Sequence, residues 1–70
     1  MPLSTLSKRE RQVLQLVALG KTSREIAFAL GVSPGTVDTY RRRLMTKLDI
    51  DNLPNLVRFA VRHGVVTPWP

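Results

Sequence analysis

Helix-capping patterns punctuate this chain from end to end and limit it to short helices. Ser7 and Thr22 are each followed three residues later by glutamate, which is the capping-box pattern that satisfies free N–H groups at a helix start. Gly20 and Gly31 follow the two segments that begin there, and glycine in a left-handed conformation commonly ends a helix. The pattern predicts one helix over about residues 8–19 and a shorter one between Thr22 and Gly31.

The second half of the chain carries two further helix starts. Ser33 is a natural N-cap and Pro34 suits a first turn, so a third helix is predicted over about 34–48. Asn52 can cap a fourth helix over about 53–63. Apolar residues show no period-two alternation, and no internal repeat is present. The sequence therefore predicts an all-α fold, a four-helix bundle with short connections.

The charge balance favours a polyanionic partner. The 70 residues contain 11 Lys or Arg against five Asp or Glu, for a net charge of +6. In so small a domain this excess points to nucleic acid before a membrane surface. No apolar run approaches the roughly 20 residues that a membrane span needs, and no signal-peptide pattern opens the chain. We expect a cytoplasmic protein with no membrane partner.

The sequence offers no set of residues for catalysis or for holding a metal. An enzyme needs a nucleophile with a base, paired carboxylates, a metal cluster or a glycine-rich phosphate loop, and none of these patterns is present. Cysteine is absent and His63 is the single histidine, which excludes the usual zinc ligand sets. The sequence predicts no catalytic residue, no metal and no cofactor.

The predicted third helix combines a buried stripe with a strongly basic face. At 100° per residue, Val37, Leu44 and Leu48 fall within a narrow arc that we expect to be buried. A merely solvated helix face is the alternative for the other side, but threonine is a poor choice for one. A short capped helix precedes this segment across a tight turn, which is helix-turn-helix geometry. The opposite face carries Thr36, Asp38, Thr39, Arg42, Arg43, Thr46 and Lys47.

These residues resemble a known family. The small Ala27 and the turn residue Gly31 stand where the helix-turn-helix signature has them, among the apolar positions Ile26, Leu30, Val32, Val37 and Tyr40. Over nearly its whole length the chain resembles the LuxR-type DNA-binding domain, also called NarL/FixJ-type. The motifs that carry the resemblance are Arg9-Glu10-Arg11, Val13-Leu14, Ile26-Ala27, Thr36-Val37 and Lys47-Leu48.

The resemblance implies a sequence-specific double-stranded DNA-binding domain of a bacterial transcription regulator, such as a response regulator of a two-component system. It implies a domain over residues 6–66, with 1–5 as an N-terminal tail or linker remnant and 67–70 as a C-terminal tail. The family usually carries a receiver or ligand-binding module ahead of this domain. Activation of transcription would add a contact with RNA polymerase.

Site roles follow from the resemblance, position by position. Many family members have lysine at the position of Asp38 and histidine at that of Tyr40, and an acid at the first resembles the FixJ-like branch. For Asp38, an intrahelical pair with Arg41 or Arg42 is an equal alternative to base contact. The family's base-contacting positions are Asp38, Thr39 and Arg42. Its phosphate-contacting positions are Lys21, Ser33, Thr36, Tyr40, Arg43 and Lys47.

Apolar residues cover a wider arc of the predicted fourth helix than one core face needs. Leu53, Leu56 and Ala60 suffice for the core. The remaining residues are expected to meet the same helix of a second protomer, so that a two-fold homodimer reads an inverted repeat; the alternative is that the C-terminal tail covers them. This predicted dimer interface consists of Val57, Arg58 and Val61.

Two other functions compete with this interpretation. In a protein-interaction module the fourth helix would be the working surface, and the basic helix would only be solvated. A sigma-factor-like promoter-reading domain shares the first helix and the basic third one, but lacks the extra C-terminal helix. Single-strand or RNA binding ranks lower because an aromatic stacking surface is missing. The sequence assigns no role to Trp69 in the tail.

Overall fold

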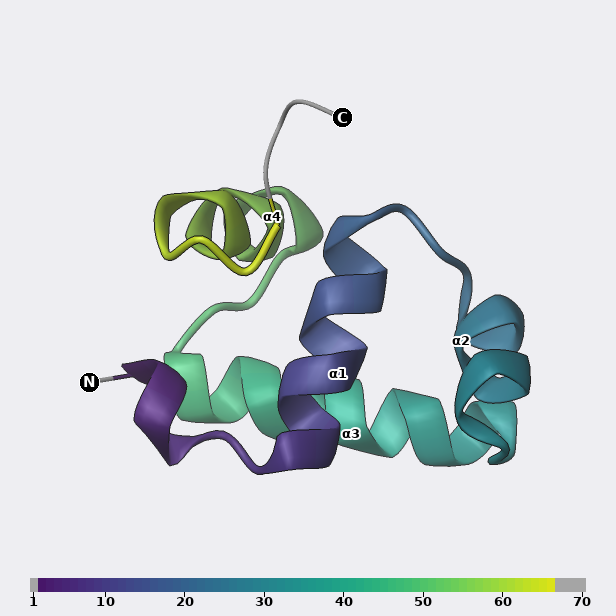
Figure 1. The fold of residues 1–70 in the computed structure, drawn as a ribbon. Coiled ribbons are helices and arrows are strands. Elements are labelled where there is room, and N and C mark those ends of the chain that lie inside the picture. The colour runs from purple at the N-terminus through teal and green to yellow at the C-terminus, as the bar shows by residue number, and fades with distance from the viewer. Residues whose placement is uncertain (1, 67–70) are drawn as a thin grey trace.

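The computed structural model describes residues 2–66 and builds them entirely from helices and their connections. A short 3-10 helix, η1 (Pro2–Thr5), precedes four α-helices. In Figure 1, α1 crosses near the middle of α3, α2 lies at the N-terminal end of α3, and α4 lies beside α1. This arrangement confirms the predicted all-α fold with four helices and a helix-turn-helix. The four helices are α1 (Lys8–Ala18), α2 (Ser23–Leu30), α3 (Pro34–Leu48) and α4 (Leu53–Arg62).

Each helix begins at the residue whose side chain can cap it. The Ser7 Oγ accepts from the Glu10 backbone N–H at 3.1 Å, and the Ser7 N–H donates to Glu10 Oε1 at 2.8 Å. Thr22 begins α2 in the same reciprocal way, while Ser33 and Asn52 cap α3 and α4 with their side chains alone. Local hydrogen bonding thus explains why all four predicted starts are confirmed.

Two helix ends differ slightly from the prediction, and one has an unexpected residue. Helices α1 and α4 end at Ala18 and Arg62, one residue earlier than predicted. Gly31 ends α2 with φ of +70°, as its position predicts. Asp49 ends α3 with φ of +56°, in the left-handed region that glycine usually occupies. Aspartate is among the few other residues that adopt this conformation readily.

One hydrophobic core joins all four helices. Its most deeply buried large side chains are Leu14, Ile26, Leu44 and Leu56, each at most 1% exposed. The 4% exposure of Ala27 confirms that a small side chain lies where α2 packs against α3. Among residues 4–66, whose burial the structure describes, the buried apolar residues are Leu6, Val13, Leu14, Val17, Ile26, Ala27, Val37, Leu44, Leu56 and Ala60.

Fewer residues of α4 are buried in the core than predicted. Leu56 and Ala60 are fully buried, but Leu53 is 49% exposed, so its assignment to the core was wrong. Leu53 is the first residue of α4, and side chains of a helix lean toward its N-terminus, which carries a first-turn residue past the core. Together with the half-buried Val57 and the 37% exposed Val61, Leu53 forms an apolar stripe at four-residue spacing. We call these three residues the α4 stripe.

Beyond α4 the chain turns back toward the core. The Val65 N–H donates to the Ala60 carbonyl at 2.8 Å, and Val65 and Val66 pack against the core while remaining partly exposed. Trp69 lies outside the described residues. No helix within residues 2–66 combines the length and apolarity needed to cross a membrane.

Candidate nucleic-acid interface

The turn between α2 and α3 fixes how the basic helix is presented. The left-handed Gly31 reverses the chain, and the Val32 N–H donates back to the Ala27 carbonyl at 3.0 Å. Val32 is itself partly buried against the core. Ser33 then starts α3 at once. The core contact of Val32 and its backbone hydrogen bond thus fix the short turn that joins α2 to α3 in a helix-turn-helix.

One side of helix α3 is buried against the core and the other is exposed, as the sequence predicts. Val37 and Leu44 are fully buried, and Leu48 is half-buried. At 100° per residue, the three predicted base-contacting positions fall on one side of α3, away from Val37 and Leu44. Arg42 is exposed there, whereas Asp38 and Thr39 are half-buried. Of the predicted phosphate-contacting residues, Thr36 and Tyr40 are half-buried, while the exposed ones are Lys21, Ser33, Arg43 and Lys47.

Two arginines on this face, Arg42 and Arg43, make no ion pair within residues 2–66. Within residues 2–66, the carboxylates that lie within 4 Å of a cation are those of Asp38 and Glu10, paired with Arg41 and Lys47. Arg42 and Arg43 therefore have no carboxylate partner in this part of the chain. Two adjacent arginines with free donors can bind phosphate or base edges without first breaking an ion pair.

Asp38 has two partners inside the protein. Its Oδ1 accepts from Arg41 Nη2 at 3.4 Å, which is the intrahelical pair that the sequence leaves open. The same oxygen accepts from Ser23 Oγ on α2 at 2.8 Å. The sequence reasoning missed this second contact, because a helical wheel of one segment shows nothing of a residue 15 positions away. The available signal was a hydroxyl in the first turn of α2, beside a helix-turn-helix partner carrying an acid.

The hydroxyls of Thr36 and Thr39 on α3 also make contacts within the protein. Thr39 Oγ1 donates to the Gly35 carbonyl at 3.1 Å, and Thr36 Oγ1 lies 2.9 Å from Ser33 Oγ at the helix start. A hydroxyl that donates to the backbone keeps its acceptor lone pairs, and a threonine keeps its methyl group. Thr39 therefore retains the groups that can contact a thymine methyl or a base-edge donor.

Lys47 makes an interhelical contact at the other end of α3. Its Nζ lies 2.7 Å from Glu10 Oε1 and donates to the Thr5 carbonyl at 3.2 Å. Glu10 is only 3% exposed, so this contact compensates a buried charge and joins η1 and α1 to α3. Two of the three ammonium donors are used in this way. The predicted phosphate contact by Lys47 remains a prediction, now with a structural role beside it.

The environment of Glu10 predicts an acid-sensitive fold. The hydrogen bond from Lys47, followed by that from the Ser7 backbone, lowers the pKa of Glu10 below its ordinary value of 4.5. A depressed pKa contributes stability that is complete above the unfolded-state value and is lost as pH falls through the folded-state value. We expect the free energy of unfolding, measured with urea, to fall from about pH 5 to pH 3, and Glu10→Gln to flatten this fall.

Glu25 supplies the matched control for this prediction. Its pKa is also lowered, first by the Thr22 backbone and then by the Thr22 side chain, but Glu25 is exposed and makes only its local capping box. Glutamine preserves a capping box at either position. Glu25→Gln should flatten the pH profile less than Glu10→Gln. A Glu10→Gln profile identical to that of the wild type would contradict the assigned role of the Glu10–Lys47 contact.

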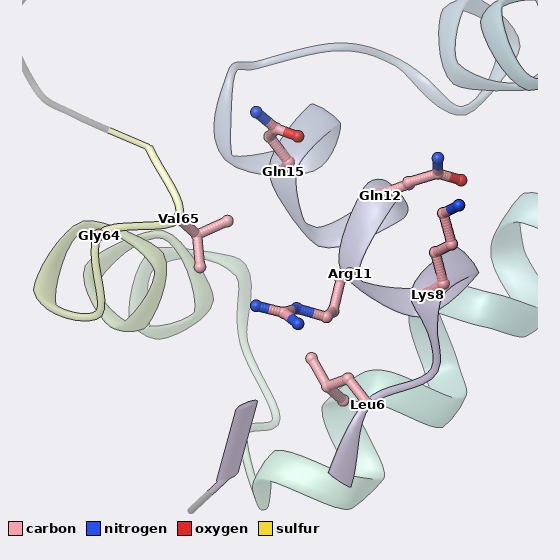
Figure 2. Close-up of a pocket in the computed structure, with 7 residues that line it drawn as sticks. All are labelled: Leu6, Lys8, Arg11, Gln12, Gln15, Gly64 and Val65. Atoms are coloured by element: carbon pink, nitrogen blue, oxygen red, sulfur yellow. The ribbon is translucent and has the colours of Figure 1, made fainter. Parts of the chain in front are cut away.

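A shallow hollow of about 480 Å³ lies on another part of the surface, between α1 and the segment after α4. Figure 2 shows Arg11 extending between Leu6 and Val65. The lining offers cationic, amide and apolar side chains, with no carboxylate, thiol or imidazole: Leu6, Lys8, Arg11, Gln12, Gln15, Gly64 and Val65. Within residues 2–66 no group of three potential metal ligands gathers.

Comparison with known proteins agrees with this geometry. The family model for bacterial regulatory proteins of the luxR family matches residues 4–60. The chain is 48% identical over 63 residues to the transcriptional regulatory protein FixJ of Azorhizobium caulinodans, covering 90% of this chain and 30% of that protein. It is 39% identical over 64 residues to the response regulator UvrY of Escherichia coli, covering 91% and 29%.

A solved structure shares the fold. The crystal structure of full-length FixJ from B. japonicum matches with a TM-score of 0.84 and 38% sequence identity, covering 94% of this chain and 32% of that one. The chain spans about 30% of the length of the relatives it matches. The helix-turn-helix, the exposed basic face of α3 and these similarities agree: the chain belongs to the luxR family of bacterial regulatory proteins, as a helix-turn-helix domain.

Proposed function

We propose that this chain is the sequence-specific double-stranded DNA-binding domain of a bacterial transcription regulator, with α3 lying in the major groove. The exposed face of α3, where Arg42 and Arg43 have free guanidinium groups, carries the proposal. The second helix of a helix-turn-helix fits the major groove, which distinguishes all four base pairs. The proposed role is binding rather than catalysis, and relatives named as transcription regulators support it.

The proposed contacts divide into base reading and phosphate binding. Arg42 can donate two hydrogen bonds to guanine, Thr39 can contact a thymine methyl, and Asp38 can accept from cytosine N4. Phosphate contacts supply most of the affinity and carry no sequence information. We assign them to Lys21, Ser33, Thr36, Tyr40, Arg43 and Lys47.

Duplex binding measured at several salt concentrations tests this proposal. The titration uses fluorescence anisotropy with one labelled duplex and unlabelled competitors of different sequence. Released counterions should make the logarithm of the binding constant fall linearly with the logarithm of salt concentration. One group of competitors should displace the label far better than the rest. Binding that is absent at low salt, or equally strong for single strands, would contradict the proposal.

We further propose that α4 forms the interface of a homodimer on DNA. The α4 stripe exposes three apolar side chains on one side of a helix, and Arg58 is exposed beside it. The turn at Val65 and Val66 packs on the core yet leaves Val61 37% exposed, so within residues 2–66 nothing covers the stripe completely. The predicted interface of Val57, Arg58 and Val61 then extends to Leu53. A two-fold pair would bind half-sites about one helical turn apart.

Val61→Glu should separate binding by two copies from binding by one. A charge buried within an apolar interface remains unpaired, so we expect about a tenfold or larger loss of affinity for a duplex with two half-sites. Affinity for a single half-site should stay unchanged. Asn55→Glu adds the same charge to an exposed position elsewhere on α4 and should leave both affinities as they are. Equal losses on both duplexes would contradict the interface.

The relatives suggest the protein in which this domain acts. Because the chain covers about 30% of FixJ and UvrY, we propose that a receiver or ligand-binding module belongs to the full protein, as in a response regulator of a two-component system. Such a regulator would act in the cytoplasm. RNA polymerase would be its further partner when it activates transcription.

A further inference from the structure

The hydroxyl of Ser23 bridges the two helices of the helix-turn-helix. Ser23 is the first residue of α2, and Thr22 already caps that helix, so the Ser23 hydroxyl is not needed as a cap. It donates instead to Asp38 Oδ1 on α3 at 2.8 Å. Both residues are half-buried. This hydrogen bond to a carboxylate belongs to the stronger class, because one partner is charged.

The two carboxylate oxygens of Asp38 have different surroundings. Oδ1 accepts a hydrogen bond from the Ser23 hydroxyl and another, at the longer distance of 3.4 Å, from Arg41 Nη2. Oδ2 has no partner within residues 2–66, and the Asp38 side chain is 47% exposed. Without Ser23, the side chain would be free to rotate toward the neighbouring arginines. Holding it in advance removes the entropy cost of ordering it when a base pair is read.

We propose that Ser23 is a specificity-determining residue that acts through Asp38. Its hydroxyl fixes Oδ1, which leaves Oδ2 as a positioned acceptor for an amino group in the major groove, with cytosine N4 as the matching donor. The same hydrogen bond keeps the carboxylate from pairing with Arg42, whose donors stay free. This inference rests on the proposed function and assigns a positioning role to a residue on α2.

A double-mutant cycle on the free 70-residue chain tests the contact without DNA. Unfolding in urea is compared for the wild type, Ser23→Ala, Asp38→Ala and the double variant. Alanine suits a first-turn helix position, so Ser23→Ala changes little besides the hydroxyl. The losses should be non-additive, with Ser23→Ala shifting the midpoint less when Asp38 is already alanine. Additive losses would overturn the inference whatever DNA binding shows.

A second experiment measures base preference. The base pair opposite Asp38 is identified as the one at which Asp38→Ala loses discrimination between preferred and substituted duplexes. Ser23→Ala should lower discrimination at that same pair by about three- to tenfold, a part of the value of one base contact. Affinity for unrelated duplexes and its salt dependence should not change. Ser23→Thr keeps the hydroxyl and should restore discrimination.

Each other outcome has a definite meaning. Equal losses on all duplexes for Ser23→Ala would make Ser23 a phosphate contact and overturn the inference. An unchanged preference, or a further loss in the Asp38→Ala background, would overturn it too. A wild-type chain with no preferred duplex would overturn the proposed function, and the reading role of Asp38 with it. The unfolding cycle separates that case from failure of the Ser23 contact itself.

Discussion

Leu44→Ala should destabilise the domain by about 2–5 kcal/mol, enough to unfold much of a chain this small. Leu44 is fully buried and lies on the inner side of α3. Its loss removes apolar contacts and leaves a cavity that the surrounding helices fill only in part. Urea unfolding followed by circular dichroism measures the change. DNA binding should be lost in proportion to the unfolded fraction.

A leucine outside the core provides the control. Leu19→Ala deletes the same atoms from a side chain that is 55% exposed, and surface substitutions usually change stability by within about 0.5 kcal/mol. A loss for Leu44→Ala no larger than that for Leu19→Ala would contradict the assigned core. Because Leu44 faces away from the proposed DNA-binding side of α3, Leu44→Ala should weaken DNA binding only through the loss of stability.

Arg42→Ala should cost about 1–3 kcal/mol on the preferred duplex and relax specificity at one base pair. Arg42 is exposed on the side of α3 that carries the proposed base contacts, and within residues 2–66 no carboxylate pairs with it. Removing its donors would leave a guanine edge without partners, so the penalty falls on the preferred sequence. Competition binding with single-base-pair variants of that duplex measures the effect.

Arg62→Ala is the matched control for charge. It removes one arginine from the last turn of α4 rather than from α3, and it should leave base preference unchanged. A uniform loss on every duplex for Arg42→Ala would move Arg42 from the base contacts to the phosphate contacts. Thr39 and Asp38 would then carry the specificity.

Local interactions explain why the helices are predictable from the sequence. Ser7 and Thr22 meet their glutamates three residues later, so a short pattern determines where α1 and α2 begin. The buried residues of α3 follow from helical periodicity, since Val37 and Leu44 repeat at the spacing of one face. Each of these interactions is encoded within a few residues, and a single sequence displays it directly.

Contacts between helices could not be predicted in the same way. Glu10 was predicted as part of a capping box, yet its buried carboxylate also pairs with Lys47, 37 positions away. The Ser23–Asp38 hydrogen bond depends likewise on how α2 packs on α3. Leu53 shows the same limit for burial. A helical wheel gives the direction of its side chain, but it does not show that this first residue of α4 lies past the core. Candidate residues were therefore predictable, whereas their partners were not.

Selection of bound duplexes from a random DNA pool tests the central claim most directly. The 70-residue chain is mixed with the pool, bound duplexes are recovered and sequenced, and the enriched sequence is titrated at several salt concentrations. We predict enrichment of an inverted repeat whose half-sites lie about one helical turn apart. Salt-sensitive binding with no enriched sequence would contradict the claim, because α3 would then bind only phosphate and read no base.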